Sequence, residues 1–252
     1  MKAAVLSVVI LLASGAIPSA AASAPAKPAA KKTSAKRTTP KSATQPLTPL
    51  QRLGRLPNGP RPTVLQAAYA SYQAAVQDGT ASRTGLLTVI DYSLPSTEPR
   101  LWVFDLTRVR ILYRELVAHG RGSGDNVATE FSNDEGSYMS SLGLFITDEA
   151  YVGKNGYSMR LRGLDPGIND HAYDRAIVVH GASYVSRKVA DEGGRLGRSL
   201  GCPAVRPKVA HKLIDTIKDG SVMYVYGEPL VTSEGQISRS RSDTPIDSLP
   251  PR

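Results

Sequence analysis

Short apolar runs separated by turn-forming residues dominate residues 63–231 of this 252-residue chain. Apolar residues at helical spacing predict a helix over 64–77, and a second helix fits 207–218 because Pro207 stands at its start and Gly220 follows its end. Many short strands with few helices predict a mainly β fold, a β-sandwich or open barrel. The runs rich in Val, Ile, Leu and aromatic residues that predict strands are 86–92, 101–106, 109–118, 142–147, 157–162, 176–180 and 222–226.

Residues 1–24 have the pattern of a secretory signal peptide. Lys2 precedes the apolar run Ala3–Ala13, and small residues follow up to Ala24. The run is shorter than the ~20 residues that span a membrane, so we expect cleavage and no remaining transmembrane anchor, with an uncleaved anchor as the alternative. The protein is then secreted, to a periplasm or a cell envelope.

Residues 25–62 are rich in Pro, Ala and Lys and predict a basic, disordered linker. Residues 1–62 hold ten of the 31 Lys and Arg and none of the 22 Asp and Glu, which leaves a formal charge of −1 on residues 63–252. A nucleic-acid-binding domain carries its own basic face, so we expect no nucleic acid as partner. The linker is either a solvated spacer or weakly attracted to anionic envelope polymers. Residues 63–231 form the one predicted folded domain, and 232–252 a mobile polar tail.

The only cysteine, Cys202, follows a loop rich in glycine, and His180 ends a predicted strand upstream of it. A thiol is a nucleophile as its thiolate, and a neighbouring imidazole can accept its proton. Arg195 and Arg198 flank the loop, and positive charge favours the thiolate. The alternative is an inert, buried cysteine that packs as a small hydrophobic residue.

Other chemistries fit the sequence less well. No set of His, Asp or Glu has the spacing of zinc ligands, so we expect neither a metal nor another cofactor. His119 also ends a predicted strand, and a structural role suits it better. Papain-like peptidases place the cysteine before the histidine, which is the reverse of the order here.

An ordered series of motifs resembles the L,D-transpeptidase (YkuD-like) family, and more closely its murein L,D-transpeptidase catalytic-domain branch. The resemblance covers roughly residues 65–226. The motifs that carry it are Phe131-Ser132-Asn133, Ser140-Ser141-Leu142-Gly143, Leu161-Arg162-Gly163-Leu164, Asn169-Asp170, His180-Gly181-Ala182-Ser183-Tyr184-Val185-Ser186 and Gly197-Arg198-Ser199-Leu200-Gly201-Cys202-Pro203-Ala204-Val205.

The resemblance implies an envelope enzyme that acts on peptidoglycan stem peptides, both as donor and as acceptor. Its cysteine attacks the peptide bond after the third residue of a tetrapeptide stem, the terminal D-alanine leaves, and an acceptor amine resolves the thioester into a 3→3 cross-link. Carried over, Cys202 is the nucleophile, His180 the base, and the carbonyl of Gly181 orients the imidazole. The N–H groups of Gly201 and Cys202 are the expected oxyanion donors.

Further positions follow from the same resemblance. Ser199 matches the Ser or Thr of the family signature, whereas the signature's second histidine is Leu200 here. Ala204 stands where a polar residue is common, and Arg198 or Arg206 can supply its charge. The candidates for the substrate groove are Ser140, Ser141, Tyr157 and Arg206.

Two other functions remain open at this point. If water rather than an amine resolves the thioester, the protein is an L,D-carboxypeptidase. If the thiol is unreactive, it is a non-catalytic wall-binding module. The sequence does not separate these from the transpeptidase.

Overall fold

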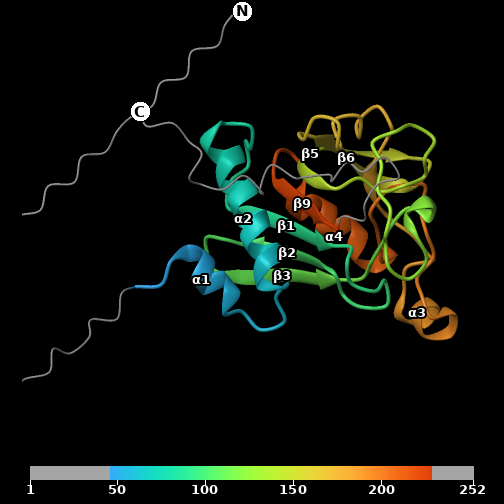
Figure 1. The fold of residues 1–252 in the computed structure, drawn as a ribbon, viewed down its shortest axis with the longest axis horizontal. Helices are drawn as coiled ribbons and strands as arrows, with labels where there is room; N and C mark the ends of the chain where they lie inside the picture. The colour runs from blue at the N-terminus through green and yellow to red at the C-terminus, as the bar shows by residue number, and fades with distance from the viewer. Residues whose placement is uncertain (1–45, 229–252) are drawn as a thin grey trace, which may run out of the picture. The chain divides into compact units, whose positions relative to one another are not determined.

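The computed structural model describes residues 46–228 (Figure 1). The expected signal peptide, most of the expected linker and the expected tail lie outside these residues. The described part begins inside the segment that we expected to be a linker. Its first helix, α1 (Pro49–Gly54), is capped by Thr48, whose side chain accepts a hydrogen bond from the backbone N–H of Gln51 while the Gln51 side chain accepts one from the N–H of Thr48.

The linker expectation is therefore wrong for residues 49–62. Leu53 of α1 is only 2 % exposed and joins an apolar cluster with the second helix, α2 (Pro62–Gln77). Burial of Leu53 stabilises the ordered conformation of α1, although the Pro-rich composition of the segment predicts disorder. α2 confirms the helix expected over 64–77, and it begins two residues earlier because Pro62 suits a first-turn position.

Nine strands form one sheet, in the order β3-β2-β1-β9-β5-β6-β7-β8-β4. All seven predicted strand runs contribute to it, and the expected run 109–118 forms both β3 and β4. The bounds are β1 (Leu86–Asp91), β2 (Leu101–Asp105), β3 (Arg110–Glu115), β4 (Val117–Ala118), β5 (Gly143–Gly153), β6 (Gly156–Gly163), β7 (Val178–Gly181), β8 (Ala204–Val205) and β9 (Val222–Tyr226).

The sheet curls into a nearly closed barrel. Its two edge strands, β3 and β4, are separated along the chain by a single residue, Leu116, so the opposite edges of the sheet must approach one another. β1 and β9, the first and last strands along the chain, pair in parallel as the third and fourth strands of the sheet. The fold is thus mainly β, as the sequence predicts.

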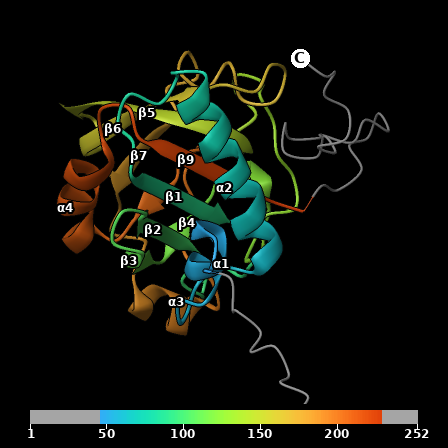
Figure 2. The same ribbon diagram turned by 90° about the vertical axis from the view of Figure 1, so that its left-hand side faces the viewer.

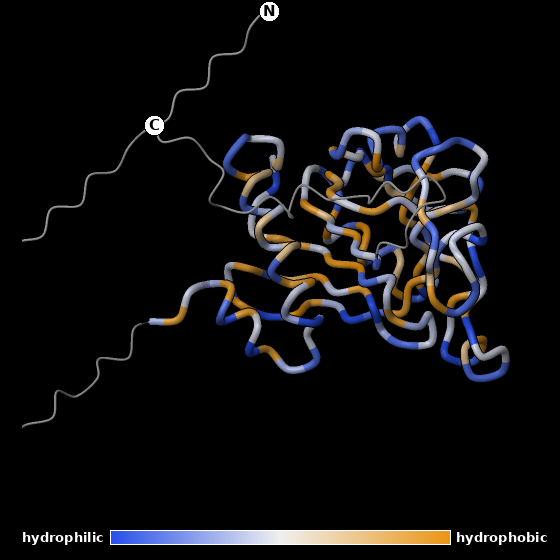
Figure 3. The backbone as a smooth tube through the Cα atoms, in the orientation of Figure 1, coloured by the Kyte–Doolittle hydropathy of each residue, from blue (hydrophilic) through white to orange (hydrophobic). Residues whose placement is uncertain are grey.

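Helices pack on both sides of the sheet. α2 crosses the face of β1 and β9, where Val89 and Tyr224 belong to its apolar cluster (Figure 2). α4 (Pro207–Ile217) packs on the other side, with Leu213 and Ile214 in a cluster that includes Val179. The expected helix over 207–218 is confirmed to within one residue. The apolar backbone segments follow the strands, as the hydropathy colouring shows (Figure 3).

Three elements near the cysteine were not predicted, of which the first is the two-residue strand β8. A short helix, α3 (Arg187–Gly193), begins at Ser186, whose side chain accepts a hydrogen bond from the N–H of Val189. A 3₁₀ turn, η1 (Arg121–Ser123), follows β4. Of the helices in residues 46–228, none is long and apolar enough to cross a membrane.

Candidate active site

Two adjacent parallel strands bring His180 and Cys202 into one region. In the β7–β8 pair His180 lies opposite Ala204, so Cys202, two residues before Ala204, lies diagonally across from His180. Both side chains are largely buried, with 5 % of His180 and 9 % of Cys202 exposed. The fold thus places an imidazole near the end of β7 and, 22 positions later in the sequence, a thiol in the loop just before the neighbouring strand β8.

The imidazole of His180 is oriented by backbone. Its Nδ1 lies 3.1 Å from the carbonyl oxygen of Gly181, so Nδ1–H donates and Nε2 keeps its lone pair. Burial lowers the pKa of His180 below its usual value, because the charged ring would lose hydration. The histidine is therefore neutral at pH 7 and can accept a proton at Nε2. A Cβ on Gly181 would lie 2.9 Å from the Cβ of Ala210, so this carbonyl is presented by a residue that must be small.

The thiol of Cys202 is held by the backbone just before β7. The N–H of Val178 donates to Sγ at 3.4 Å, and Sγ–H donates to the carbonyl oxygen of Ala176 at 3.7 Å. Burial raises the pKa of Cys202, while the Val178 N–H and the charge of Arg175 oppose that rise. The resting thiol is thus protonated at neutral pH and needs a base before it can attack.

Arg175 is a residue that the sequence analysis missed. Its guanidinium donates four hydrogen bonds to the segment 132–141, which packs beside the cysteine loop, and it is a cation that acts on the thiol. The sequence expectation named Arg195 and Arg198 for that charge. Arg198 instead donates to the carbonyl oxygen of Gly124 and pairs with Asp125, both at 2.9 Å.

The hydroxyl of Ser199 organises the cysteine loop. It accepts a hydrogen bond from the N–H of Gly201 at 3.1 Å and donates one to the carbonyl oxygen of Cys202 at 2.6 Å. The N–H of Gly201 is therefore occupied, which contradicts its expected role as a free oxyanion donor. Gly201 has a φ of +127°, and a Cβ there would lie 2.9 Å from the Met139 carbonyl oxygen, so the loop requires glycine at this point.

Ser140 and Ser141 do not line an open groove. Ser140 is 2 % exposed; its hydroxyl donates to the carbonyl oxygen of Gly201 at 2.9 Å and accepts from the N–H of Gly120 at 3.0 Å. Ser141 is also buried, and it accepts a hydrogen bond from Arg175 at 2.6 Å. Ser140 thus braces the cysteine loop, whereas Ser141 contacts Ser132 and Arg175. Both hydroxyls are engaged in internal hydrogen bonds, so the groove expectation is wrong for these two serines.

Tyr157 and Arg206 also have other roles. Ser158 lies opposite His180, so Tyr157, the next residue along the strand, points to the opposite face. There it stacks on His211 of α4 and donates to Asp215 at 2.6 Å. Arg206 forms a two-point ion pair with Glu115 at the end of β3, with both contacts at 2.7 Å. It thereby ties the start of α4 to the edge of the sheet.

A buried polar cluster supports the strand that adjoins the cysteine loop. Arg100 is fully buried and donates to the carbonyl oxygens of Val117 and Leu94, and its Nη2 donates to Nδ1 of His119 at 2.7 Å. Burial, reinforced by the charge of Arg100, lowers the pKa of His119 to about 4. The N–H of Ser199 donates to the carbonyl oxygen of His119 at 3.0 Å. The structural role expected for His119 is therefore confirmed.

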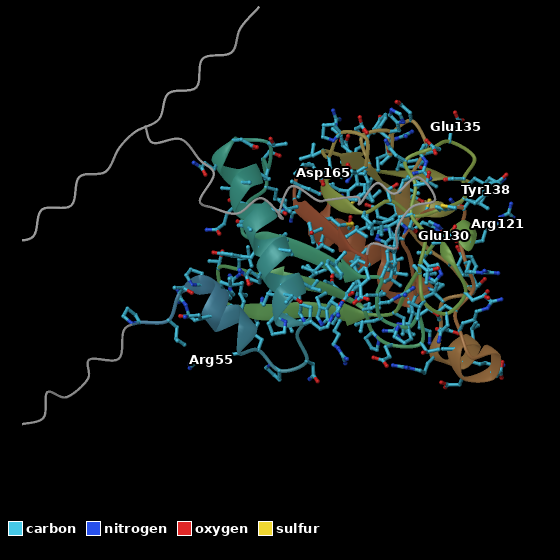
Figure 4. The ribbon with its side chains drawn as sticks, viewed as in Figure 1. Arg55, Arg121, Glu130, Glu135, Tyr138 and Asp165 are labelled. Atoms are coloured by element: carbon cyan, nitrogen blue, oxygen red, sulfur yellow. The ribbon has the colours of Figure 1, made fainter. Side chains whose placement is uncertain are left out.

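The rim of the cysteine loop carries exposed side chains. Leu200 is 59 % exposed and Tyr138 is 41 % exposed. The guanidinium of Arg121 lies over the ring of Tyr138, 4.1 Å from its centroid, and the two side chains project side by side in Figure 4. Within residues 46–228, no three His, Cys, Asp or Glu residues are grouped as metal ligands would be.

A comparison with family models matches residues 58–226 to the model described as the L,D-transpeptidase catalytic domain. The chain belongs to this family. The match includes β1 to β9 and therefore every residue of the site described above. No curated protein matches the chain significantly.

Solved structures with a related fold share little sequence with this L,D-transpeptidase family member. An L,D-transpeptidase from Mycobacterium smegmatis is 13 % identical with a TM-score of 0.35, over 56 % of this chain and 58 % of that one. An L,D-transpeptidase from Stackebrandtia nassauensis is 15 % identical with a TM-score of 0.35, over 70 % and 73 %. The helical cell shape determining protein Pgp2 from Campylobacter jejuni is 12 % identical with a TM-score of 0.39, over 65 % and 56 %. The chain thus spans less than two thirds of the first of these structures.

Proposed function

We propose that this protein is a peptidoglycan L,D-transpeptidase that forms 3→3 cross-links through a thioester on Cys202, with His180 as general base. The observation that carries the proposal is the β7–β8 register, which sets His180 diagonally across from Cys202, together with the contact of Nδ1 with the Gly181 carbonyl. That contact leaves Nε2 as the proton acceptor. Membership of the L,D-transpeptidase catalytic domain family supports the substrate class.

In the first half-reaction, Nε2 of His180 takes the proton of the Cys202 thiol as Sγ attacks the carbonyl carbon of the third stem residue. The bond from that carbon to the nitrogen of the terminal D-alanine then breaks. The imidazolium returns its proton to the leaving amine, and the stem stays bound as a thioester. Burial favours the neutral forms of both groups at rest, so the proton moves from the thiol to the imidazole as Sγ attacks rather than beforehand.

In the second half-reaction, the side-chain amine of another stem attacks the thioester carbonyl and gives its proton to His180. The carbon–sulfur bond breaks and the thiol recovers the proton, so the enzyme returns to its initial state. The N–H of Cys202 is the expected oxyanion donor that remains, because Ser199 occupies that of Gly201. The loop bonds of Ser199 and Ser140 fix this donor's backbone in place.

The test is intact mass spectrometry of products from a disaccharide-tetrapeptide, with wild type beside Cys202→Ala. The expected result is a dimeric product with loss of D-alanine, made by wild type alone. A tripeptide product without dimer would identify a carboxypeptidase instead. Folded wild type that gives neither product nor a covalent adduct would refute thiol catalysis on this substrate and favour a wall-binding module.

We also propose that the protein acts in the cell envelope, where the proposed substrate lies. The apolar run Ala3–Ala13 after Lys2 supports export. Fractionation of cells that produce the full chain, with N-terminal sequencing of the mature protein, tests the point. Cleavage near Ala24 is expected, and an intact N-terminus in the cytoplasmic fraction would oppose it.

A further inference from the structure

Arg160 of β6 is held between two tyrosine rings. The carbon at the centre of its guanidinium lies 4.9 Å from the ring centroid of Tyr151 and 5.0 Å from that of Tyr173. Tyr151 comes from the neighbouring strand β5, and Tyr173 from the segment before β7. Two cation–π contacts from separate parts of the chain fix the plane of the guanidinium, so little side-chain entropy is left to lose on binding a ligand.

This arginine faces the same side of the sheet as His180. In the antiparallel β6–β7 pair, Arg160 lies opposite Val178 and Ser158 lies opposite His180. Residues two apart on a strand share a face, so Arg160, Val178, Ser158 and His180 lie on one side. Ser158 and Val178 are almost fully buried, whereas Arg160 is only partly buried.

Arg160 is also close to the thiol. The N–H of Val178 points towards Cys202, to whose Sγ it donates, and therefore away from β6. Arg160 and Val178 thus form a non-hydrogen-bonded pair, the closer of the two antiparallel types, with Cα atoms roughly 4.5 Å apart. One strand width and one extended side chain place the guanidinium on the order of 10 Å from Sγ, about the length of three extended residues.

The donors of this guanidinium are available. Within residues 46–228, the guanidinium of Arg160 takes part in no side-chain hydrogen bond and no ion pair, and its contacts are with the two tyrosine rings. A carboxylate that feels its charge, Asp148, is bonded at 2.7 Å to Arg162 and at 2.9 Å to the N–H of Glu149. Arg162, not Arg160, is the main cause of the lowered pKa of Asp148. A fixed cation with free N–H groups beside a candidate nucleophile is suited to a planar, anionic ligand.

We propose that Arg160, held by Tyr151 and Tyr173, binds one carboxylate of the donor peptide stem and so selects stems in which that group is a free acid. The proposal rests on the function proposed above, because it assumes that a stem peptide lies across β6 and β7 at Cys202. Guanidinium and carboxylate match in a two-point hydrogen-bonded pair, and an amide in place of the carboxylate would remove both the charge and one acceptor. Arg160 acts here in binding and takes no part in bond breaking.

The test is a binding cycle on the full chain carrying Cys202→Ala, which removes turnover. Calorimetry measures the Kd of a tetrapeptide stem and of analogues in which a single carboxylate is an amide. We expect Arg160→Gln to raise the Kd of the free-acid stem about 10- to 100-fold. One amide analogue should bind as weakly to the parent protein, and Arg160→Gln should then have no further effect on it. Arg160→Lys should be intermediate, because it keeps the charge but not the two-point geometry.

Arg162→Gln is the matched control. It removes the same charge two residues away on the same strand, but from an arginine already paired with Asp148 at 2.7 Å. We expect its Kd values to stay within about twofold of the parent. If Arg160→Gln and Arg162→Gln raise the Kd equally, the effect is one of net charge and the proposal is overturned. The proposal is also overturned if Arg160→Gln raises the Kd of every analogue by the same factor.

Turnover separates this inference from the proposed function. Wild type that forms the cross-link while Arg160→Gln leaves both binding and turnover unchanged would overturn the carboxylate site and leave the proposed function intact. A parent protein that binds no stem peptide would overturn the site as well. Thermal unfolding of each variant shows whether weak binding reflects a misfolded protein. If Arg160→Gln is misfolded, the Kd of Arg160→Lys tests the carboxylate site instead: an intermediate Kd supports the site, and an unchanged Kd overturns it.

Discussion

The hydroxyl of Ser199 donates a 2.6 Å hydrogen bond to the carbonyl oxygen of Cys202. The hydroxyl oxygen of Ser199 also accepts a hydrogen bond from the N–H of Gly201, so one side chain closes a tight turn in which Leu200 is 59 % exposed. The position that is a second histidine in the family signature is thereby turned outward.

Ser199→Ala is expected to slow thioester formation more than it destabilises the fold. The loss of two hydrogen bonds should lower the free energy of unfolding by roughly 1–3 kcal/mol, while displacement of the loop should slow acylation on the order of 100-fold. Acylation by a stem peptide, followed by mass spectrometry, and urea unfolding measure the two effects. Ser199→Thr retains the hydroxyl and should stay near wild type. Equal acylation rates for the Ala and Thr variants would rule out the positioning role.

Loss of Arg175 should make the thiol less acidic. Burial raises the pKa of Cys202 above 9 and Arg175 partly offsets this, so Arg175→Met removes a cation that favours the thiolate. Since the thiolate is the form that reacts, alkylation by iodoacetamide rises with pH through this pKa. The midpoint of that rise should move to higher pH in Arg175→Met.

Two further variants separate charge from loop anchoring in this experiment. Arg175→Lys keeps the charge but loses several of the bonds to residues 132–141, so it should restore much of the midpoint without restoring stability. Arg198→Met removes a cation whose bonds run to Gly124 and Asp125, and it should leave the midpoint unchanged. A shift with Arg198→Met as large as that with Arg175→Met would contradict the assignment of the cation.

The free energy of unfolding should fall as the pH drops below 6.5. His119 has a pKa of about 4 in the folded protein, against an ordinary value of 6.5, so the unfolded chain binds the proton first. The stabilisation is complete above pH 6.5 and is lost as the pH falls to about 4, which amounts to roughly 2 kcal/mol between pH 6.5 and 5. Urea unfolding at pH 7 and pH 5 measures it.

His119→Gln supplies the comparison for the pH experiment. A glutamine can accept from Arg100 and donate to the Gly124 carbonyl without titrating, so its unfolding should depend less on pH over this range. His180, whose pKa is also lowered, is present in both proteins and cancels in the difference. An identical pH dependence in the two proteins would mean that His119 does not titrate as described.

The strands that carry the site could be predicted from sequence because their apolar runs are bounded by turn residues. Residues 176–180 and 222–226 are such runs, and both form strands. α1 escaped notice because its surroundings are rich in Pro and basic residues, although Thr48 and Gln51 already have the spacing of a capping box. The overall composition of the segment predicted disorder, whereas this local capping motif predicted the helix.

The roles of single side chains were harder to predict, because they depend on register. Nothing local distinguishes Arg160 from Arg162, yet pairing across β6 and β7 sets the first opposite Val178, and Arg162 pairs with Asp148. Ser140 lies 61 positions before Gly201 and binds its carbonyl all the same. Such contacts arise from the curling of the sheet, which the order of hydrophobic runs does not specify.

The pairing of β1 with β9 has a consequence for how the chain folds. β9 ends at Tyr226 and lies between β1 and β5, so without it the sheet consists of two unconnected halves, β3-β2-β1 and β5-β6-β7-β8-β4. During synthesis from the N-terminus, the two halves of the sheet therefore cannot be joined until β9, and with it almost the whole domain, has been made. Contacts so distant in sequence close slowly. The loop that carries Cys202 leads into β8 of the later half, so the site joins β1, β2 and β3 in one sheet only when β9, the last strand, pairs with β1 and β5.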